Sequence, residues 1–513
     1  MKILRLCVIL LIISLCCSTS CEANKMSNAD IREPAVAGKF YPDSATKLKS
    51  AVEHFLKDAL PVKVKKPVAL IVPHAAYIFS GQISAVGFKQ VSHEKYDVIV
   101  ILGTNHTNSS FQKISLYPGR GFRTPLGTAL IDKSVVSALI KEDPEVCALD
   151  KSLHESEHSV EVMVPFIQVV FPEAKIVPAV VGSPDMQMCT RFGRALAKVL
   201  KNRRALIVAS SDLSHYPSAE NADFVDRETL AAVAKLDPVI LQATLKSQAG
   251  RSIPNLHTSV CGEAPILATM AAAGALGATH GVVVSYANSG DMSVGDRSRV
   301  VGYGAVVFSA EDKDQGKPFV VSSHPAATVS AELTPSDKKA LLTFARKTIS
   351  RILTTDTVPL ARGFDERLQQ PRGVFVTLRK KGDLRGCIGR MIADEPLAKL
   401  VGVMSLQAAF NDKRFTQLTA DELKDIEIEI SVLTPMKQVA GADDIVVGRD
   451  GVLLSKDGYS AVFLPQVAAE QGWNREQMLD HLCLKAGLTA GSWKKGAKFS
   501  TFQAIVFSES QFK

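Results

Sequence analysis

The chain has 513 residues, which is too long for one ordinary hydrophobic core, so two to four domains are expected. With 46% hydrophobic and 22% charged residues, the composition is that of folded globular protein and argues against disorder. The net charge of +8 comes from scattered lysines and arginines, and no nucleic-acid-binding motif accompanies them, so no nucleic acid is expected as a partner.

Residues 1–21 have the pattern of a secretory signal. Two basic residues precede an apolar run over 6–17, which is short for a membrane span of ~20 residues. Small residues follow and end at Cys21, as in a bacterial lipoprotein signal, although Ser18 stands where such signals usually carry leucine. We therefore expect an exported protein, periplasmic or lipid-anchored in the cell envelope, whose contact with the membrane would be a lipid on Cys21.

Strand-like and helix-like patterns alternate between residues 32 and 308. Short runs of Val, Ile and Leu predict buried strands, and their alternation with helices indicates an α/β fold with a largely parallel sheet covered on both faces. The predicted strands are residues 68–72, 97–102, 175–181, 205–209, 282–286 and 300–308, and the predicted helices between them include 80–90 and 186–200.

A polar stretch over residues 309–332 predicts a linker to a second, smaller domain over 333–508. Thr334 and Pro335 are typical of a helix cap and of the first helical position. The mixture of elements that follows indicates an α+β domain. Its predicted helices are residues 397–409 and 475–486, and its predicted strands are 374–378, 426–432, 452–454 and 461–464.

Metal-binding side chains follow the predicted strands of the first domain. His74 and His106 come within four residues of two strand ends, and Cys261 begins a Cys-Gly-Glu motif whose glycine would allow close backbone approach. In open α/β sheets, ligands gather beyond the carboxyl ends of the strands. Two imidazoles and one thiolate can bind a transition metal and leave positions open for substrate or oxygen.

The same domain contains further residues that could take part in acid–base chemistry. Asp212 and His215 follow the strand at 205–209 and could orient the ligands or transfer protons. His158 and Glu161 are at helical i, i+3 spacing, which predicts that both point into the same cleft. Each residue also has a purely structural alternative, such as a helix cap for Asp212. Their coincidence at one edge of the sheet favours a metal or acid–base site.

Several motifs in order resemble the Memo family, also called AmmeMemoRadiSam system protein B. They are Glu-Pro-Ala-Val-Ala-Gly-Lys-Phe-Tyr-Pro at 33–42, Pro-His-Ala-Ala-Tyr at 73–77, Glu-His-Ser-Val-Glu at 157–161, Ser-Ser-Asp-Leu-Ser-His at 210–215 and Cys-Gly at 261–262. The resemblance implies a fold like that of class III extradiol dioxygenases, which use non-haem Fe(II). It also implies a copper or iron site of His74, His106 and Cys261, with Asp212 and His215 nearby, and a link to redox chemistry.

Two features depart from these patterns. Thr104 stands where the family resemblance leads us to expect proline, two residues before His106. The ring-cleaving enzymes use a carboxylate as third ligand, whereas this chain has Cys261. A thiolate with two imidazoles suits copper or zinc at least as well as an oxygen-activating iron. Dioxygenase activity therefore does not follow from the resemblance.

The second domain resembles the AMMECR domain, or AmmeMemoRadiSam system protein A. The motifs are Arg-Gly-Val-Phe-Val-Thr-Leu at 372–378, Leu-Arg-Gly-Cys-Ile-Gly at 384–389, Asn-Asp-Lys-Arg-Phe at 411–415 and Ile-Glu-Ile-Ser-Val-Leu-Thr-Pro at 428–435. The fusion implies a radical-SAM protein of the same system as a partner. Cys387 is either part of a structural hairpin or a nucleophile activated by Arg385 and Arg390.

Three functions remain open from the sequence. The first is a copper- or iron-dependent redox or dioxygenase-like protein of the AmmeMemoRadiSam system, acting on an unidentified substrate. The second is a non-enzymatic metal-binding or scaffold protein of the cell envelope. The third is hydrolysis by a zinc-activated water, which needs the same ligands. Whether the chain is an enzyme is not decided by these patterns.

Overall fold

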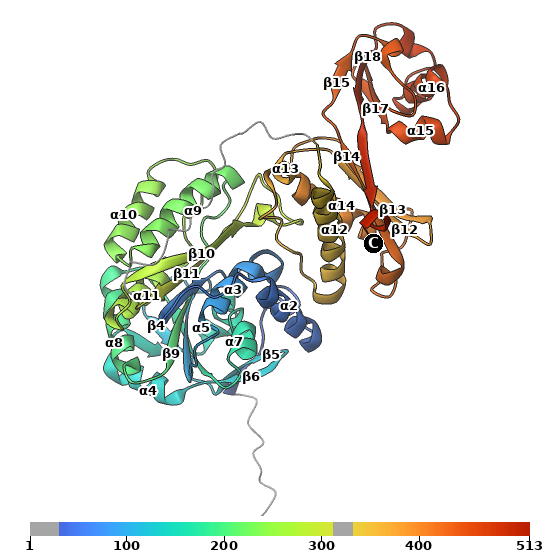
Figure 1. Cartoon of the computed structure of the whole chain (residues 1–513). Coiled ribbons are helices and arrows are strands. Elements are labelled where there is room, and N and C mark those ends of the chain that lie inside the picture. The colour runs from blue at the N-terminus through green and yellow to red at the C-terminus, as the bar shows by residue number, and fades with distance from the viewer. Residues whose placement is uncertain (1–29, 311–331, 513) are drawn as a thin grey trace, which may run out of the picture.

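The computed structural model describes residues 30–310 and 332–512. The predicted signal at 1–21 and most of the predicted linker lie outside the described residues. Within the described ranges, every helix is too short or too polar to cross a membrane. The first part of the chain is drawn in blue to yellow in Figure 1, and the second part in gold to red.

The first part is built around an eight-stranded sheet. In sheet order its strands are β10 (His280–Asn288), β11 (Gly302–Ser309), β2 (Pro67–Val72), β9 (Ala205–Ser210), β3 (Val98–Thr104), β8 (Lys175–Val181), β4 (Ile114–Leu116) and β7 (Cys147–Leu149). The four central strands, β2, β9, β3 and β8, are parallel to their central neighbours. They correspond to four of the predicted strands, and the α/β class is confirmed.

The prediction of a largely parallel sheet is corrected, because the outer strands pair partly antiparallel. β10 pairs antiparallel with β11, β11 with β2, and β4 with β8, so the sheet is mixed. For β10 and β11 the physical reason is that their connection, residues 289–301, contains only the 3-10 turn Ser289–Asp291 and no crossover α-helix. A parallel pair needs a crossover of a dozen or more residues, usually helical, whereas an antiparallel pair does not.

Helices cover both faces of this sheet. Along β11, Gly304 lies against Leu230 of α9 (Ala219–Ala234), whereas Ala305 lies against Gly87 of α3 (Tyr77–Val91). Because successive strand residues point to opposite faces, α9 and α3 are on opposite sides. The other helices are α2 (Ala45–Asp58), α4 (Lys133–Glu142), α5 (Ser152–Glu155), α6 (His158–Glu161), α7 (Val164–Val170), α8 (Met186–Leu200), α10 (Pro238–Ala249) and α11 (Glu263–Ala275). A small separate sheet contains β1 (Ile31–Arg32), β5 (Gly121–Thr124) and β6 (Gly127–Leu130).

The second part contains two smaller hydrophobic cores. Its first helix, α12 (Pro335–Thr355), begins as predicted, with Thr334 and Asp337 forming a reciprocal capping box. With α14 (Leu397–Phe410), it covers a sheet of β13 (Asp383–Arg390), β12 (Val374–Lys380), β14 (Ile426–Leu433) and β19 (Ala504–Ser508).

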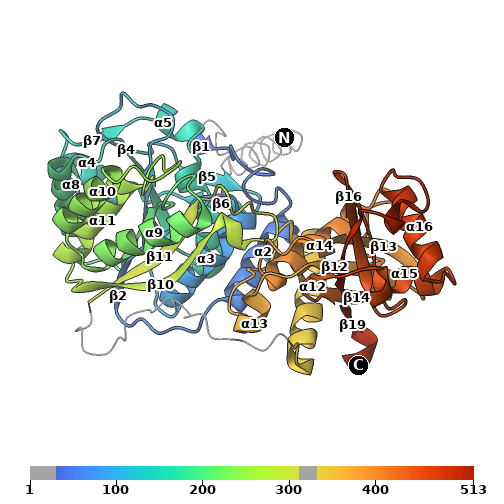
Figure 2. The same ribbon diagram turned by 90° about the horizontal axis from the view of Figure 1, so that it is seen from above.

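The second of these cores lies at the end of the molecule far from the first part (Figure 2). Its elements are β15 (Lys437–Val439), β18 (Lys498–Phe502), β16 (Gly451–Lys456), β17 (Tyr459–Phe463), α15 (Pro465–Glu470) and α16 (Arg475–Lys485).

The close packing of α8 on α11 gives a test of the first core. A Cβ atom at Gly193 of α8 would lie 2.7 Å from the backbone oxygen of Ala268 in α11. We predict that Gly193→Ala lowers the free energy of unfolding by ~1–3 kcal/mol, because overpacking outweighs the gain of ~1 kcal/mol in helix propensity. Thermal unfolding of the two variants measures this. The matched control is Gly274→Ala in α11, where a Cβ would contact nothing within 4 Å and stability should rise or stay unchanged.

Candidate metal centre

Three neighbouring strand ends form the candidate metal centre. His74 follows β2, Asp212 follows β9 and His106 follows β3, each by two residues. In the sheet, β9 lies between β2 and β3 and is parallel to both, so the three loops leave the same edge. The structure therefore brings together residues that are separated by up to 138 positions, as the contact from Asp212 to the His74 backbone illustrates.

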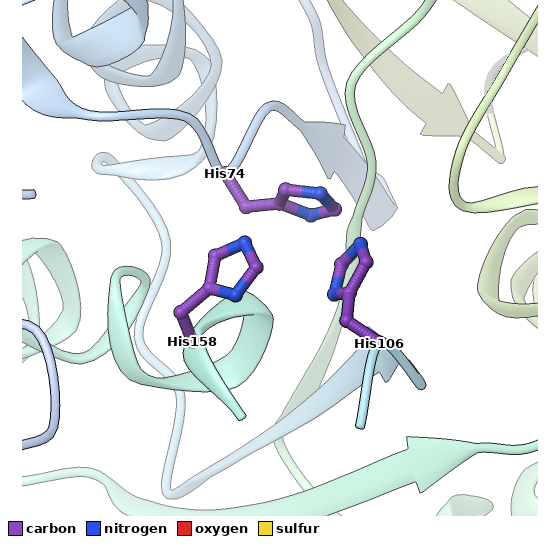
Figure 3. A group of neighbouring side chains, drawn as sticks. All are labelled: His74, His106 and His158. Carbon is purple, nitrogen blue, oxygen red and sulfur yellow. The ribbon is translucent and has the colours of Figure 1, made fainter. Parts of the chain in front are cut away.

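His74, His106 and His158 face one another in a compact cluster (Figure 3). Their ring centroids lie 5.1 Å apart for His74 and His106, 5.4 Å for His74 and His158, and 4.6 Å for His106 and His158. One ring nitrogen from each comes within 4.8 Å of the other two, a spacing that can hold a metal ion. His158, which the sequence analysis assigned to acid–base chemistry, is thus placed beside two of the predicted ligands.

A second group of metal-binding atoms shares His74 with the first. It contains His74, Asp212 and Cys261, again within 4.8 Å of one another. The Cys261 sulfur lies 3.1 Å from His74 Nε2, and Asp212 Oδ2 lies 3.9 Å from the same nitrogen. The predicted trio of His74, His106 and Cys261 is therefore divided between two overlapping groups, with His74 common to both.

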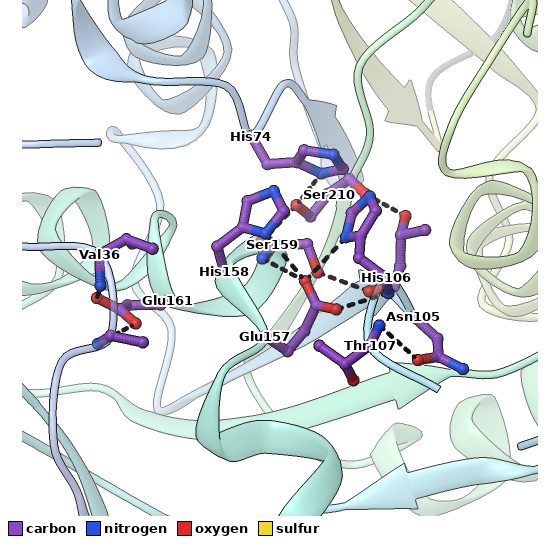
Figure 4. A network of polar contacts seen from close by, with 12 residues as sticks. Val36, His74, Asn105, His106, Thr107, Glu157, His158, Ser159, Glu161 and Ser210 are labelled. Carbon is purple, nitrogen blue, oxygen red and sulfur yellow. Dashed lines mark hydrogen bonds and ion pairs between the residues drawn. The ribbon is translucent and has the colours of Figure 1, made fainter. Parts of the chain in front are cut away.

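The hydrogen bonds of Ser210 determine which nitrogen of His74 is free. The Ser210 hydroxyl donates its proton to the backbone oxygen of Ser159 at 2.5 Å, and it lies 2.9 Å from His74 Nδ1 (Figure 4). Since the hydroxyl has one proton, its oxygen must accept the second bond from a protonated Nδ1. The lone pair of His74 is then on Nε2, which faces Cys261 and Asp212.

Glu157 determines which nitrogen of His106 is available for a metal. The sequence analysis did not select Glu157 as a site residue. One of its oxygens lies 2.9 Å from His106 Nδ1 and 3.5 Å from His158 Nδ1. Burial opposes its charge, but the hydrogen bond and the charge of His106 outweigh this and lower the pKa of Glu157 to about 2. A carboxylate only accepts, so His106 donates from Nδ1 and leaves Nε2 for a ligand bond. The sequence feature that could have identified Glu157 is its position directly before His158.

Asp212 lies next to both His74 and His215. Asp212 Oδ1 accepts the backbone N–H groups of His74 and Ala75 at 2.8 and 3.2 Å, which fixes the loop after β2. Asp212 Oδ2 lies 3.9 Å from His215 Nε2, a buried nitrogen without a hydrogen-bond partner among the described residues. A buried polar atom without a partner is unfavourable, so a ligand that pairs with it would be stabilised here.

Without a metal, burial disfavours the charged forms of three residues in the centre. It lowers the pKa of His74 well below its usual value, with His106 and His158 adding to the effect. It raises the pKa of the Cys261 thiol well above its usual value, and the neighbouring Asp212 adds to this. Burial also raises the pKa of Asp212. Neutral imidazoles are ready to bind a metal, whereas the thiol must lose a proton first.

The prediction that Glu161 shares a cleft with His158 is wrong. Its carboxylate forms an ion pair with Arg32, accepts the hydroxyl of Tyr41, and accepts the N–H groups of Ala35 and Val36 at 2.9 and 3.1 Å. Figure 4 shows it directed away from the histidines. The residue is fully buried, so a paired cation and donors are needed to stabilise its charge. Its contacts attach the segment before α2 to α6.

Cys387 lies on β13, at the edge of the four-stranded sheet that α12 and α14 cover. Its sulfur accepts a hydrogen bond from the Thr377 hydroxyl at 3.3 Å, and its backbone N–H donates to Asp412 at 2.9 Å. Arg414 donates to its carbonyl oxygen at 3.1 Å. The predicted hairpin is confirmed by the antiparallel pairing of β12 with β13, and the structural and nucleophilic alternatives for Cys387 both remain.

Comparison with known proteins identifies both parts. Residues 32–307 match a family model described as Memo-like protein, and residues 342–507 match the AMMECR1 model. A MEMO1 family protein of Aquifex aeolicus is 38% identical over 279 residues, which cover 54% of this chain and 99% of that protein. One of Methanopyrus kandleri is 34% identical over 294 residues, 54% of this chain and 98% of that protein.

Among solved structures, an uncharacterized protein of Pyrococcus horikoshii is 34% identical, with a TM-score of 0.32, and the match covers 34% of this chain and 91% of that one. The two matches follow one another along the chain, with the Memo-like part first. This chain belongs to the Memo family and carries an AMMECR1 domain after its Memo-like part.

Proposed function

We propose that the chain binds one transition-metal ion through His74, His106 and Cys261 and uses it for redox chemistry. The observation that carries this proposal is the distance of 3.1 Å between Cys261 Sγ and His74 Nε2. Two atoms bonded to one ion at ~2.3 and ~2.0 Å are about 3–3.5 Å apart at ordinary ligand angles. In the neutral imidazoles, hydrogen bonds at Nδ1 leave Nε2 of His74 and of His106 available for a metal, which supports the same assignment.

The donor set favours copper or iron and also permits zinc. Imidazole suits all three metals, and a thiolate adds a preference for softer ions. When bound, copper or iron would supply one-electron chemistry or activation of oxygen, as in the extradiol dioxygenases that the family resembles. His158 adds a third imidazole to the group of His74 and His106, and Asp212 adds a carboxylate to the group of His74 and Cys261.

Asp212 and His215 are the groups proposed to move protons. Their nearest atoms, Oδ2 of Asp212 and Nε2 of His215, lie 3.9 Å apart, so one substrate atom or water beside the pair could form a hydrogen bond with both. Burial raises the pKa of Asp212 and lowers the pKa of His215. These shifts bring the two pKa values closer together, which favours proton transfer through this pair.

The first test is metal content. We expect purified wild-type protein to bind about one equivalent of copper or iron, and His74→Ala and Cys261→Ala to lose most of it, because each removes a ligand. Elemental analysis after reconstitution measures this, with His93→Ala and Cys387→Ala as matched controls that should retain the ion. Equal metal in wild type and in the two ligand variants would refute the proposal.

Turnover separates the redox proposal from its alternatives. Reconstituted protein should consume oxygen or oxidise a thiol or catechol under air, and should do neither without metal. Stoichiometric metal with no turnover would instead favour a metal-binding scaffold. Activity with zinc alone on an ester or amide substrate would favour hydrolysis through an activated water.

Glu157 provides a test of ligand orientation. We predict that Glu157→Gln weakens metal binding by roughly 10- to 100-fold, because it removes the carboxylate that fixes the ring of His106. Competition with a chromophoric chelator measures the dissociation constant. Glu155→Gln, two residues earlier and exposed, changes the same charge and should bind as tightly as wild type.

The pKa of Cys261 predicts how affinity changes with pH. The thiol is protonated near neutral pH because burial raises its pKa, so metal binding must release that proton. The pKa of His74 is lowered below 6.5, so this ligand is already neutral and adds no slope. We expect the affinity for Co²⁺ to rise about tenfold per pH unit between about pH 7 and 8.5. In Cys261→Ala the dependence should largely disappear; an equally steep dependence in that variant would exclude the thiol as its source.

A further inference from the structure

A buried carboxylate attaches the loop that carries Asp212 and His215 to the sheet. Asp226 on α9 has no solvent exposure, and its Oδ1 accepts the backbone N–H of Ser214 at 2.9 Å. Its other oxygen accepts the hydroxyl of Tyr286 on β10, also at 2.9 Å. A Cβ at Gly302 would lie 1.9 Å from that oxygen, so the position of the carboxylate requires glycine there. Asp226 thus joins the loop to Tyr286.

Tyr286 is in turn contacted by a residue of the AMMECR1 side. The Arg362 guanidinium lies 5.3 Å from the centre of the Tyr286 ring and donates to its backbone oxygen at 3.2 Å. It also pairs with Asp291 at 2.8 Å and with Asp223 at 3.4 Å. Asp223 is on α9, three residues before Asp226. One arginine therefore contacts both the strand and the helix that position Asp226.

An apolar cluster between the two parts lies against the start of α3, close in sequence to His74. Met292 of the Memo-like part packs with Val358 and Leu406 of the second part, and all three are buried. Ile78 and Phe79, at the start of α3, pack against this cluster and follow His74 by four and five residues. In Figure 2 the helices α2 and α12 lie side by side along the same interface.

We propose that the AMMECR1 domain positions the metal centre, and that Arg362 is a positioning residue for Asp212 and His215. The proposal rests on the proposed metal function. The route is Arg362 to Tyr286, Tyr286 to Asp226, and Asp226 to the backbone of Ser214, which lies between Asp212 and His215. The two relatives described above are matched over 98–99% of their length by the Memo-like part, so this interface is an addition in the present chain.

The simpler role for Arg362 is adhesion between the two parts. Adhesion would protect the interface, residues 286–292 and 358–362, without affecting the loop at 211–216. Positioning would affect the loop as well. The two roles therefore differ in a quantity that does not depend on catalysis, namely amide hydrogen exchange in the loop of the metal-free protein.

The experiment compares Arg362→Met with Lys47→Met in the full chain. Lys47 pairs with Asp356 across the same interface, but both side chains are exposed, at 42% and 51%, and such a pair contributes little. We expect Arg362→Met to increase exchange at residues 211–216 and to weaken Co²⁺ binding by roughly 2- to 30-fold, with a changed absorption spectrum. Lys47→Met should match wild type in all three measurements.

Tyr286→Phe tests the link without disturbing the interface. It removes the hydroxyl bound to Asp226 and leaves the ring that Arg362 contacts, so exchange should rise at 211–216 and stay unchanged at 358–362. If Arg362→Met does not fold, this variant decides the question.

Faster exchange at 286–292 with an unchanged loop and unchanged Co²⁺ affinity in both variants would overturn the proposal. Failure of wild type to bind Co²⁺ would refute the metal function alone, since the exchange measurement still reports on positioning.

Discussion

Three adjacent parallel strands, β2, β9 and β3, end at one edge of the sheet, and the arrangement of the candidate metal centre depends on this. Their registered pairing sets the loops after them side by side, so that His74, Asp212 and His106 meet although they are distant in sequence. Cys261 joins them through backbone contact, because its N–H donates to the carbonyl oxygen of Asp212 at 3.3 Å. The strands are almost completely buried, which makes this edge a rigid support for a metal site.

Buried carboxylates organise the surroundings of the centre. Glu157 orients His106, Glu161 binds Arg32, and Asp226 binds the loop before His215. A buried charge without partners is strongly unfavourable, so each of these groups restricts the backbone to arrangements that supply donors. Their pKa values differ accordingly. Hydrogen bonds and the charge of His106 lower that of Glu157 to about 2, while burial raises that of Asp226 to about 7.

The AMMECR1 domain meets the Memo-like part close to this centre. Polar contacts of Arg362 and the apolar contacts of Met292 both lie within a few residues of elements that carry site residues. A fused chain maintains this contact at a high effective concentration, because the linker makes docking intramolecular. The Aquifex aeolicus relative is matched over 99% of its length by 54% of this chain, so the contact with the second part is an additional constraint here.

The sequence by itself determined the α/β class, the central strands, the start of α12 and the residue types of the centre. These follow from local patterns: apolar runs, capping residues, and His or Cys directly after strands. The antiparallel outer strands, the division of the predicted ligands around His74, and the separate direction of Glu161 were decided by tertiary structure. The roles of Glu157, Ser210 and Asp226 were also decided by tertiary structure. Their roles depend on which buried donors surround each carboxylate or hydroxyl, and those donors come from segments up to 136 positions away.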